Sequence, residues 1–232
     1  MTDLVFDAPK VNTIPIEGES AAYPVNRIFC VGRNYAAHAA EMGVEVDREA
    51  PFYFTKSSCH TAMSGITIPY PLGTDNYHYE MELVIVIGKP AFRVSVADGM
   101  DPIYAYGCGL DMTRRDRQLA AREKGRPWDV GKDVETSAIF SPLIKADKVG
   151  EIGPQRIHLE VNGEVKQDAH LKDLIWRLDE IVSDLSHFYH LVPGDVIMTG
   201  TPAGVGPVVA GDVITGAIDE VGTIELTIGQ PE

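Results

Sequence analysis

Cysteine is scarce in this chain of 232 residues, and its placement excludes two kinds of structure. Cys30, Cys59 and Cys108 are odd in number, widely spaced and without a C-x-x-C pair. They therefore match neither a disulfide framework nor a zinc site, and they fit a reducing compartment. The chain also lacks the G-x-S-x-G turn of serine hydrolases, the phosphate-binding loop and the dinucleotide-binding turn.

Basic residues and long apolar runs are also few. The 20 Lys and Arg residues against 34 Asp and Glu residues give a net charge of -14, which argues against nucleic acid or an anionic membrane as a partner. The first residues show no signal-peptide pattern, and no apolar stretch approaches the length of a membrane span. We therefore expect a soluble cytoplasmic protein.

Glycine (22) and proline (15) are frequent, so turns are many and strands should outnumber helices. The predicted strands are mostly not in βαβ order, which indicates an α+β class dominated by β structure. Residues 1–25 are rich in proline and weakly patterned. They predict an N-terminal arm, packed on the main domain or on a second subunit, before a single domain of residues 26–230.

Local patterns place the main elements. Asn34 predicts the N-cap of a helix that Gly43 ends, and the Asn-Gly pair in residues 158–166 predicts a hairpin. Apolar spacing over residues 174–190 predicts an amphipathic helix. Strands are predicted over residues 27–32, 51–56, 77–88 and 104–111.

Three carboxylates are the most informative feature. Glu80 and Glu82 lie two apart on a predicted strand and so share one face, beside an apolar run. Asp111 ends another predicted buried strand. Buried acids need a compensating charge, and a hard cation such as Mg²⁺ or Mn²⁺ prefers oxygen ligands. The alternative is an exposed strand end with two solvated glutamates.

Side chains that could act beside these acids follow in four places. His38 and Glu41 project from one helical face, as a general base does, although this spacing also suits an exposed helix. A helix over residues 114–123 would return Arg115 toward Asp111, with two of its three arginines at the surface. Further candidates, each also readable as an ordinary structural or surface residue, are Gln118, Lys132 and the Gly-rich turn of residues 199–206.

Taken together, five segments resemble the fumarylacetoacetate hydrolase family. Each is weak alone, but all five in the same order are specific, and they span roughly residues 26–228. The matching segments are residues 31–35 with His38 and Glu41, 78–83, 109–116, 125–128 with Lys132, and 199–206.

The resemblance implies a mixed β-sandwich roll with flanking helices, usually a homodimer, and a Mg²⁺ or Mn²⁺ site. It implies a 2-oxo acid substrate that chelates the metal, and a water activated by His38 and Glu41 on a segment that closes over it. The metal ligands implied are Glu80, Glu82 and Asp111, and the residues implied to contact substrate are Arg115, Gln118, Lys132 and Thr201.

Within the family, the chain looks most like the members that hydrolyse fumarylpyruvate in aromatic (gentisate) breakdown. The expected reaction cleaves a carbon–carbon bond of an acylpyruvate and releases pyruvate. Alternatives that reuse the same metal are an oxaloacetate decarboxylase and a 2-hydroxyhepta-2,4-diene-1,7-dioate isomerase/decarboxylase. A non-catalytic metal-binding scaffold would have lost a ligand or the base, and neither is lost here.

The chain departs from the family pattern in two places. Asp133-Val134-Glu135 follows Lys132 where a Phe-Asp pair is common, and Ser57 follows a lysine where proline is common. Both are expected near the substrate entrance, so they bear on substrate preference more than on metal binding.

Overall fold

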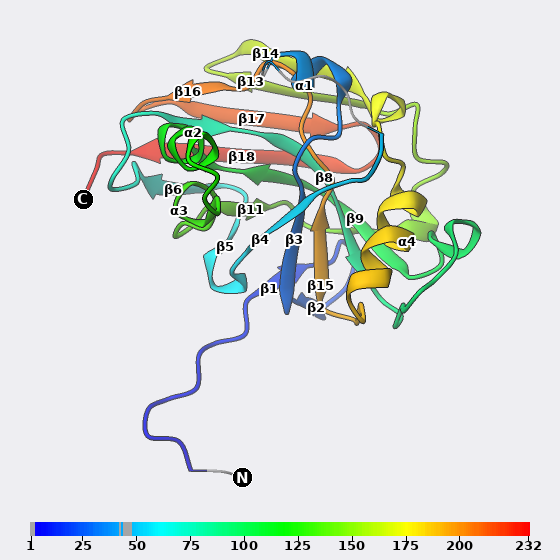
Figure 1. Cartoon of the computed structure of the whole chain (residues 1–232). Coiled ribbons are helices and arrows are strands. Elements are labelled where there is room, and N and C mark those ends of the chain that lie inside the picture. Colours follow the sequence, from blue (N-terminus) through cyan, green and yellow to red (C-terminus); the bar gives the residue numbers. More distant parts are fainter. Residues whose placement is uncertain (1–2, 42, 44–47) are drawn as a thin grey trace.

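The computed structural model describes residues 3–41, 43 and 48–232. Two curved sheets pack face to face, and helices cover only parts of their outer surface (Figure 1). The predicted α+β class, dominated by β structure, is confirmed. All three cysteines are free, and no helix in the described ranges is long and apolar enough to span a membrane.

The larger sheet has eight strands. Seven of them follow the order β4 (Tyr53–Lys56), β3 (Arg27–Val31), β15 (Asp195–Met198), β8 (Met81–Ile87), β9 (Ile103–Asp111), β11 (Ala138–Phe140) and β5 (Thr61–Met63). The eighth, β12 (Ile144–Lys145), pairs with β9 beside this path. The central pair, β8 and β9, is antiparallel and places Glu82 opposite Gly109.

Three smaller sheets complete the β structure. The five-stranded sheet runs β14 (Glu164–His170), β13 (Arg156–Val161), β17 (Val213–Ile218), β18 (Gly222–Gly229) and β6 (Ile66–Pro69). A three-stranded sheet runs β10 (Thr113–Arg114), β7 (Tyr77–Tyr79) and β16 (Gly206–Val208), and β1 (Thr13–Pro15) pairs with β2 (Ala22–Pro24).

The helices are short. They are α1 (Ala36–Glu41), α2 (Arg115–Glu123), α3 (Asp129–Lys132) and α4 (Leu178–Phe188). Single 3₁₀ turns are η1 (Ser58–His60), η2 (Val96–Asp98), η3 (Ala146–Lys148) and η4 (Leu171–Asp173).

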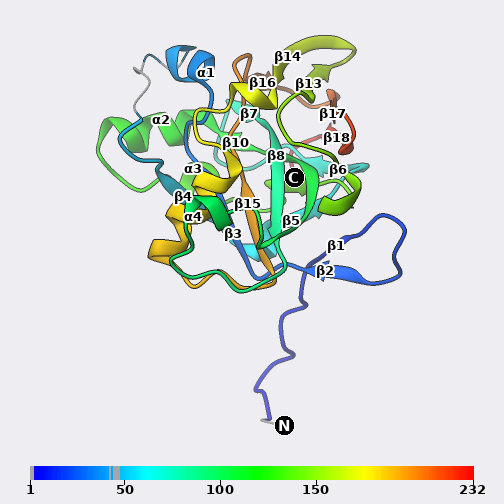
Figure 2. The ribbon, with the colours of Figure 1, turned by 90° about the vertical axis from the view of Figure 1, so that its right-hand side faces the viewer.

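Alternation along β8 divides the interior into two cores. Leu83 and Ile85 point into the core between the two large sheets, whereas Val84 and Val86 point into a second core on the other face. The hairpin of β1 and β2 covers this second core with Ile14 and other apolar side chains. Residues 3–11 are exposed and run away from the body in two perpendicular views (Figure 2).

The predicted hairpin is confirmed, with Asn162 at φ 52° and Gly163 at φ 79° in the turn between β13 and β14. Such a turn requires positive φ at both central residues, which asparagine and glycine tolerate best. The predicted amphipathic helix begins later than expected, at Leu178 instead of Leu174, and Phe188 is 69% exposed.

One contact explains this late start and a second wrong prediction. Asn34 does not cap α1, because its side chain accepts the N–H of Trp176 at 2.6 Å and donates to the backbone oxygen of Thr199 at 2.8 Å. The neighbouring Tyr35 and Leu174 form a β-bridge, and residues 175–176 form a bend, so α4 begins only after them. The predicted helix end is partly outside the described residues, at Met42; Gly43 has the expected positive φ of 67°.

Candidate metal and substrate site

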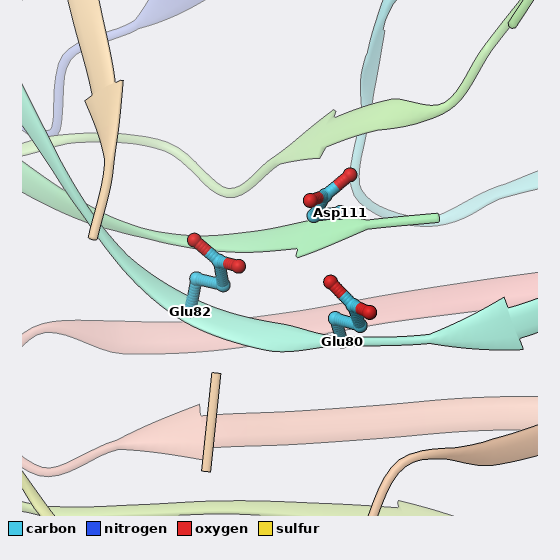
Figure 3. A group of neighbouring side chains, drawn as sticks. All are labelled: Glu80, Glu82 and Asp111. Carbon is cyan, nitrogen blue, oxygen red and sulfur yellow. The ribbon is translucent and has the colours of Figure 1, made fainter. Parts of the chain in front are cut away.

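The three predicted carboxylates converge where β8 and β9 meet (Figure 3). Glu82 lies on β8, Glu80 immediately precedes it, and Asp111 ends β9. A ligand oxygen from each lies within 4.8 Å of the others, and all three side chains are buried. Gly109 faces Glu82 across the strand pair, and glycine is needed there because a Cβ would meet Val84 Cγ2 at 2.5 Å. The alternative of two solvated glutamates is therefore wrong.

Two lysines and an arginine surround the carboxylates. Lys132 Nζ lies 2.6 Å from both Glu80 Oε2 and Asp111 Oδ2, and Lys56 Nζ lies 2.9 Å from Asp111 Oδ1. Arg115 forms an ion pair with Glu80. Although burial alone would raise it, Lys132 and Arg115 hold the pKa of Glu80 well below its usual range. The pKa of Lys132 is raised, because Asp111 and Glu80 outweigh its burial.

Glu82 has a different environment. Burial, together with the charges of Asp111 and Glu80, raises its pKa well above the usual range. Its Oε2 accepts the backbone N–H of Gly200 at 2.7 Å. Three buried carboxylates at this spacing, one of them held with a raised pKa, fit a hard divalent cation, whose charge would favour the ionised form.

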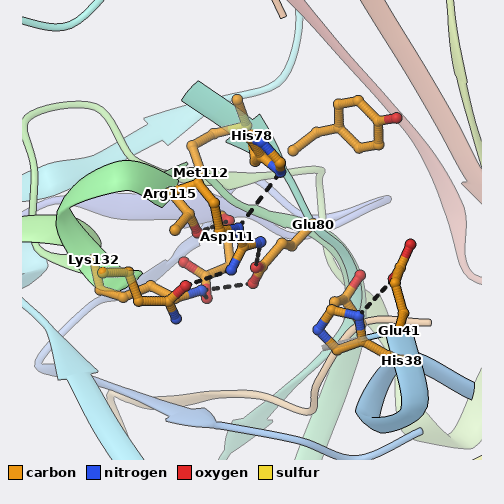
Figure 4. Close-up of polar contacts among 12 residues, drawn as sticks. His38, Glu41, His78, Glu80, Asp111, Met112, Arg115 and Lys132 are labelled. Carbon is orange, nitrogen blue, oxygen red and sulfur yellow. Dashed lines mark hydrogen bonds and ion pairs between the residues drawn. The ribbon is translucent and has the colours of Figure 1, made fainter. Parts of the chain in front are cut away.

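The predicted base lies across a small cavity from these acids (Figure 4). His38 on α1 is buried, and its Nδ1 lies 3.1 Å from Glu41 Oε2. Glu41 also accepts the backbone N–H of Gly204 at 3.2 Å. The cavity lining brings the base, one acid and the cations together: Gly32, Arg33, His38, Glu80, Arg115, Gln118, Arg122, Trp128 and Lys132.

The predicted substrate contacts are placed unevenly. Arg115 and Gln118 are buried on one face of α2 and bond to each other, as the helix spacing predicts. Thr201 is buried and accepts a hydrogen bond of 2.8 Å from Gln167, but within the described ranges it does not line this cavity. Among the other arginines, Arg117 is exposed as expected, whereas Arg114 is half-buried.

Comparison with known proteins decides the family. The family model described as fumarylacetoacetate (FAA) hydrolase C-terminal matches residues 27–229. The chain belongs to the fumarylacetoacetate hydrolase family. This family accounts for the order of the five matching segments along the chain.

Two relatives and one solved structure show how near this family member is to others. A fumarylpyruvate hydrolase of Ralstonia sp. is 53% identical over 193 residues, which cover 82% of this chain and 100% of that protein. A mitochondrial oxaloacetate tautomerase of Homo sapiens is 38% identical over 88% of this chain and 92% of its own. The crystal structure of fumarylpyruvate hydrolase from Pseudomonas aeruginosa in complex with Mn²⁺ and pyruvate has a TM-score of 0.95 and 42% identity, and it covers 98% of this chain and 100% of its own.

The sequence did not predict the contacts of two buried residues, Lys56 and Gln167, and of the half-buried His78. Lys56 is the last residue of an apolar strand, and this position was the one feature of the sequence that could have indicated a buried lysine. His78 lies 3.5 Å from Arg115 through its Nδ1, and burial together with the Arg115 charge lowers its pKa to about 4. Gln167 bridges the N–H of Met81 and the hydroxyl of Thr201, but it lies in a hairpin strand whose pattern gives no hint of burial.

Proposed function

We propose that this protein is a divalent-metal-dependent hydrolase that cleaves fumarylpyruvate, an acylpyruvate, to fumarate and pyruvate. The observation that carries the proposal is a buried three-carboxylate site next to a His–Glu pair, with Glu80 of the site and His38 of the pair lining one cavity. The 53% identity to a fumarylpyruvate hydrolase, and the near-identical fold of one with bound Mn²⁺ and pyruvate, support it.

Glu80, Glu82 and Asp111 would hold the Mg²⁺ or Mn²⁺. When bound, such a cation supplies Lewis-acid stabilisation of the negative charge that develops on the pyruvate part of the substrate. Lys132 and Arg115 neutralise Glu80 in the structure, and a bound cation would take over part of that neutralisation. The Lys132 ammonium would then be able to contact the substrate.

The protein groups account for the remaining steps. Arg115, which Gln118 orients, binds the substrate carboxylate, and Thr201 contacts the same substrate. His38, oriented by Glu41, takes a proton from a water that attacks the acyl carbonyl carbon. The bond from that carbon to the methylene of the pyruvate part then breaks. Its electron pair stays with the methylene carbon, which takes a proton and leaves as pyruvate, while the acyl group leaves as fumarate.

Residues 34–41 are the segment that we propose closes over the substrate. α1 is only six residues long and lies over the cavity, with His38 directed inward (Figure 4). Closure there would exclude bulk water from the attacking position.

Oxaloacetate chemistry is the second candidate, because mitochondrial oxaloacetate tautomerases and a decarboxylase are among the relatives. Decarboxylation needs the metal and a group that stabilises developing charge, but no base for water. A complete His38–Glu41 pair over the cavity favours hydrolysis.

The test follows the ultraviolet absorbance of fumarylpyruvate with purified protein and Mn²⁺ or Mg²⁺, with and without EDTA. Rapid decay that EDTA stops, with equal release of fumarate and pyruvate, is the expected result. Absence of decay, together with turnover of oxaloacetate, would replace the proposed substrate and retain the metal site.

We further propose a cytoplasmic homodimer that acts in gentisate breakdown, with residues 26–230 as the catalytic domain and residues 1–25 as an arm. The packing of the β1–β2 hairpin on the second core supports a structural part for the arm. Light scattering of the full chain and of a variant that begins at residue 12 would test both the dimer and the contribution of residues 1–11.

A further inference from the structure

Hydrogen bonds join the residue pair Lys56–Ser57 to the residue pair Lys132–Asp133 at the edge of the site. The N–H of Ser57 donates to Asp133 Oδ1 at 2.6 Å, and its hydroxyl donates to Asp133 Oδ2 at 2.6 Å. His60 Nδ1 lies 2.7 Å from Asp133 Oδ1. Ser57 lies between β4 and η1, His60 is the last residue of η1, and Asp133 directly follows α3. These three residues form the Asp133 clasp.

The residues next to the clasp are the two lysines of the site. Lys56 precedes Ser57, and its ammonium donates to the backbone oxygen of Lys132 as well as to Ser137 Oγ at 2.8 Å. Lys132 precedes Asp133 and reaches Glu80 and Asp111 with its own ammonium. The chain around Lys132 is therefore tied to the β4 end twice, once through its carbonyl and once through the side chain of the next residue.

α3 needs such support. It has four residues, and a single helical turn is not stable by itself in water. Its inner side is fitted closely to α2, since a Cβ at Gly131 would meet the backbone N of Gln118 at 2.8 Å. The C-terminal end of α3, where Lys132 lies, is held by the clasp and by the bond from Lys56 to the carbonyl of Lys132.

We propose that Ser57, His60 and Asp133 act together as a positioning device that sets the depth and direction of the Lys132 ammonium during carbon–carbon cleavage. The catalytic part of this proposal rests on the proposed function. Asp133 suits this task because its ionised carboxylate accepts short, charge-assisted bonds. Although burial would raise it, the bonds from Ser57 and His60 hold the pKa of Asp133 below its usual range.

Ser57→Pro is a selective probe, because Ser57 already has φ −67° and ψ 135°, which proline adopts without strain. The substitution removes the N–H and puts a ring carbon close to the Asp133 carboxylate. Ser57→Ala keeps the N–H and loses only the hydroxyl. Asp133→Ala removes the acceptor. A matched control is Asp212→Ala, because Asp212 also accepts one backbone N–H and one side-chain donor, both at 2.8 Å, in an exposed turn.

The expected result is that Ser57→Pro and Asp133→Ala each lower kcat by about ten- to hundredfold, the loss typical of a slightly misplaced catalytic group. Ser57→Ala should lose less. The kcat of the double variant Ser57→Pro/Asp133→Ala should be no lower than that of the worse single variant, because both substitutions remove the same Ser57–Asp133 contact. Mn²⁺ affinity, measured by electron paramagnetic resonance, should stay within about threefold of wild type in all variants, because no carboxylate of the triad is altered.

A second readout follows Lys132 directly. In wild type its side chain is buried, so an amine-acylating reagent should modify it slowly; in Ser57→Pro and Asp133→Ala, mass spectrometry should show faster modification. Near-wild-type kcat and unchanged Lys132 labelling in both variants would overturn the proposal, as would an equal loss of kcat in Asp212→Ala. If wild type does not hydrolyse fumarylpyruvate, the proposed function fails, and the labelling still decides whether the clasp positions Lys132. Should Asp133→Ala not fold, Asp133→Asn and Ser57→Pro carry the same comparison.

Discussion

The backbone N–H of Gly204 lies 3.2 Å from both carboxylate oxygens of Glu41. Four residues earlier, the N–H of Gly200 donates to Glu82. One Gly-rich turn thus binds a carboxylate of the proposed base and a carboxylate of the proposed metal site. A Cβ at Gly204 would meet the backbone oxygen of Lys166 at 1.9 Å, and its φ of +96° also favours glycine. The anion that this turn binds is the protein's own.

We expect Glu41→Gln to separate two reactions of the site. The amide still accepts the Gly204 N–H but orients His38 poorly and cannot stabilise its protonated form, so hydrolysis of fumarylpyruvate should fall by at least about a hundredfold. Decarboxylation of oxaloacetate, which needs no activated water, should retain most of its rate. Pyruvate release from each substrate measures both.

Glu164→Gln is a suitable control for that experiment, since Glu164 is 75% exposed and pairs only with Lys166 among the described residues. An equal loss of both reactions in Glu41→Gln would contradict this division of labour. It would place Glu41 in a step that precedes both reactions, such as closure of α1.

The raised pKa of Glu82 predicts a pH dependence of the metal-free protein. A carboxyl whose folded-state pKa exceeds its unfolded value adds stability below the unfolded pKa, and that stability is lost as pH rises through the folded pKa. The difference in unfolding free energy between Glu82→Gln and wild type should therefore grow from pH 5 to pH 8 in EDTA. At pH 8 the variant should be the more stable of the two proteins, because its neutral amide has no buried charge to form.

Metal should reverse that order. At a concentration of about 100 times its Kd, Mn²⁺ stabilises a protein that binds it by about 2.7 kcal/mol. Wild type should show this gain, and Glu82→Gln should show little of it. Urea unfolding of wild type and Glu82→Gln at pH 5 and at pH 8, each with Mn²⁺ or with EDTA, compares the two proteins under four conditions. A difference between the two proteins that does not change with pH would refute the assignment of the pH dependence to Glu82.

The sequence predicted the acids well because their placement is local. A spacing of two on a buried strand puts Glu80 and Glu82 on one face, and strand pairing brings Asp111 beside them. Local pattern made His38 and Lys132 candidates, but only the family resemblance favoured them over ordinary surface residues. Each is distant in sequence from Glu80 and Glu82. The spacing of residues within 36–41 or 129–132 does not predict that these helices face β8.

The errors have the same physical origin. Asn34 looked like a helix cap because capping is a local pattern, but its partners Trp176 and Thr199 are more than a hundred residues away. Lys56 was noted only for the residue after it, although its ammonium lies against Asp111. Long-range hydrogen bonds override a local signal when the group is buried, since a buried polar group must find its partner wherever the fold supplies one.

Asn34→Ala should destabilise the protein strongly. Asn34 makes three hydrogen bonds, to the N–H and C=O of Trp176 and to the C=O of Thr199, at 2.6 to 3.0 Å. Alanine leaves these backbone groups without that partner, and the cost is about 2–4 kcal/mol. Asn12→Ala is the matched control, because Asn12 donates one half-buried bond to Ser58, and we expect a loss of at most about 1 kcal/mol. Equal losses in urea unfolding would mean that the long-range bonds of Asn34 add nothing.

Arg115→Lys tests whether the geometry of the guanidinium, and not its charge alone, binds the substrate. Arg115 contacts Gln118 and Glu80 through separate nitrogens, and a lysine ammonium cannot hold both while presenting a planar pair of donors to a carboxylate. Loss of one charge-assisted bond, about 1.5–3 kcal/mol, predicts that KM for fumarylpyruvate and the inhibition constant for pyruvate rise by about ten- to hundredfold. Arg117→Lys on the same helix is the control, since Arg117 is half exposed and should change neither constant by more than about twofold. If Arg115→Lys binds pyruvate as wild type does but has a reduced kcat, then Arg115 acts through Glu80 on the metal site and not on the substrate carboxylate.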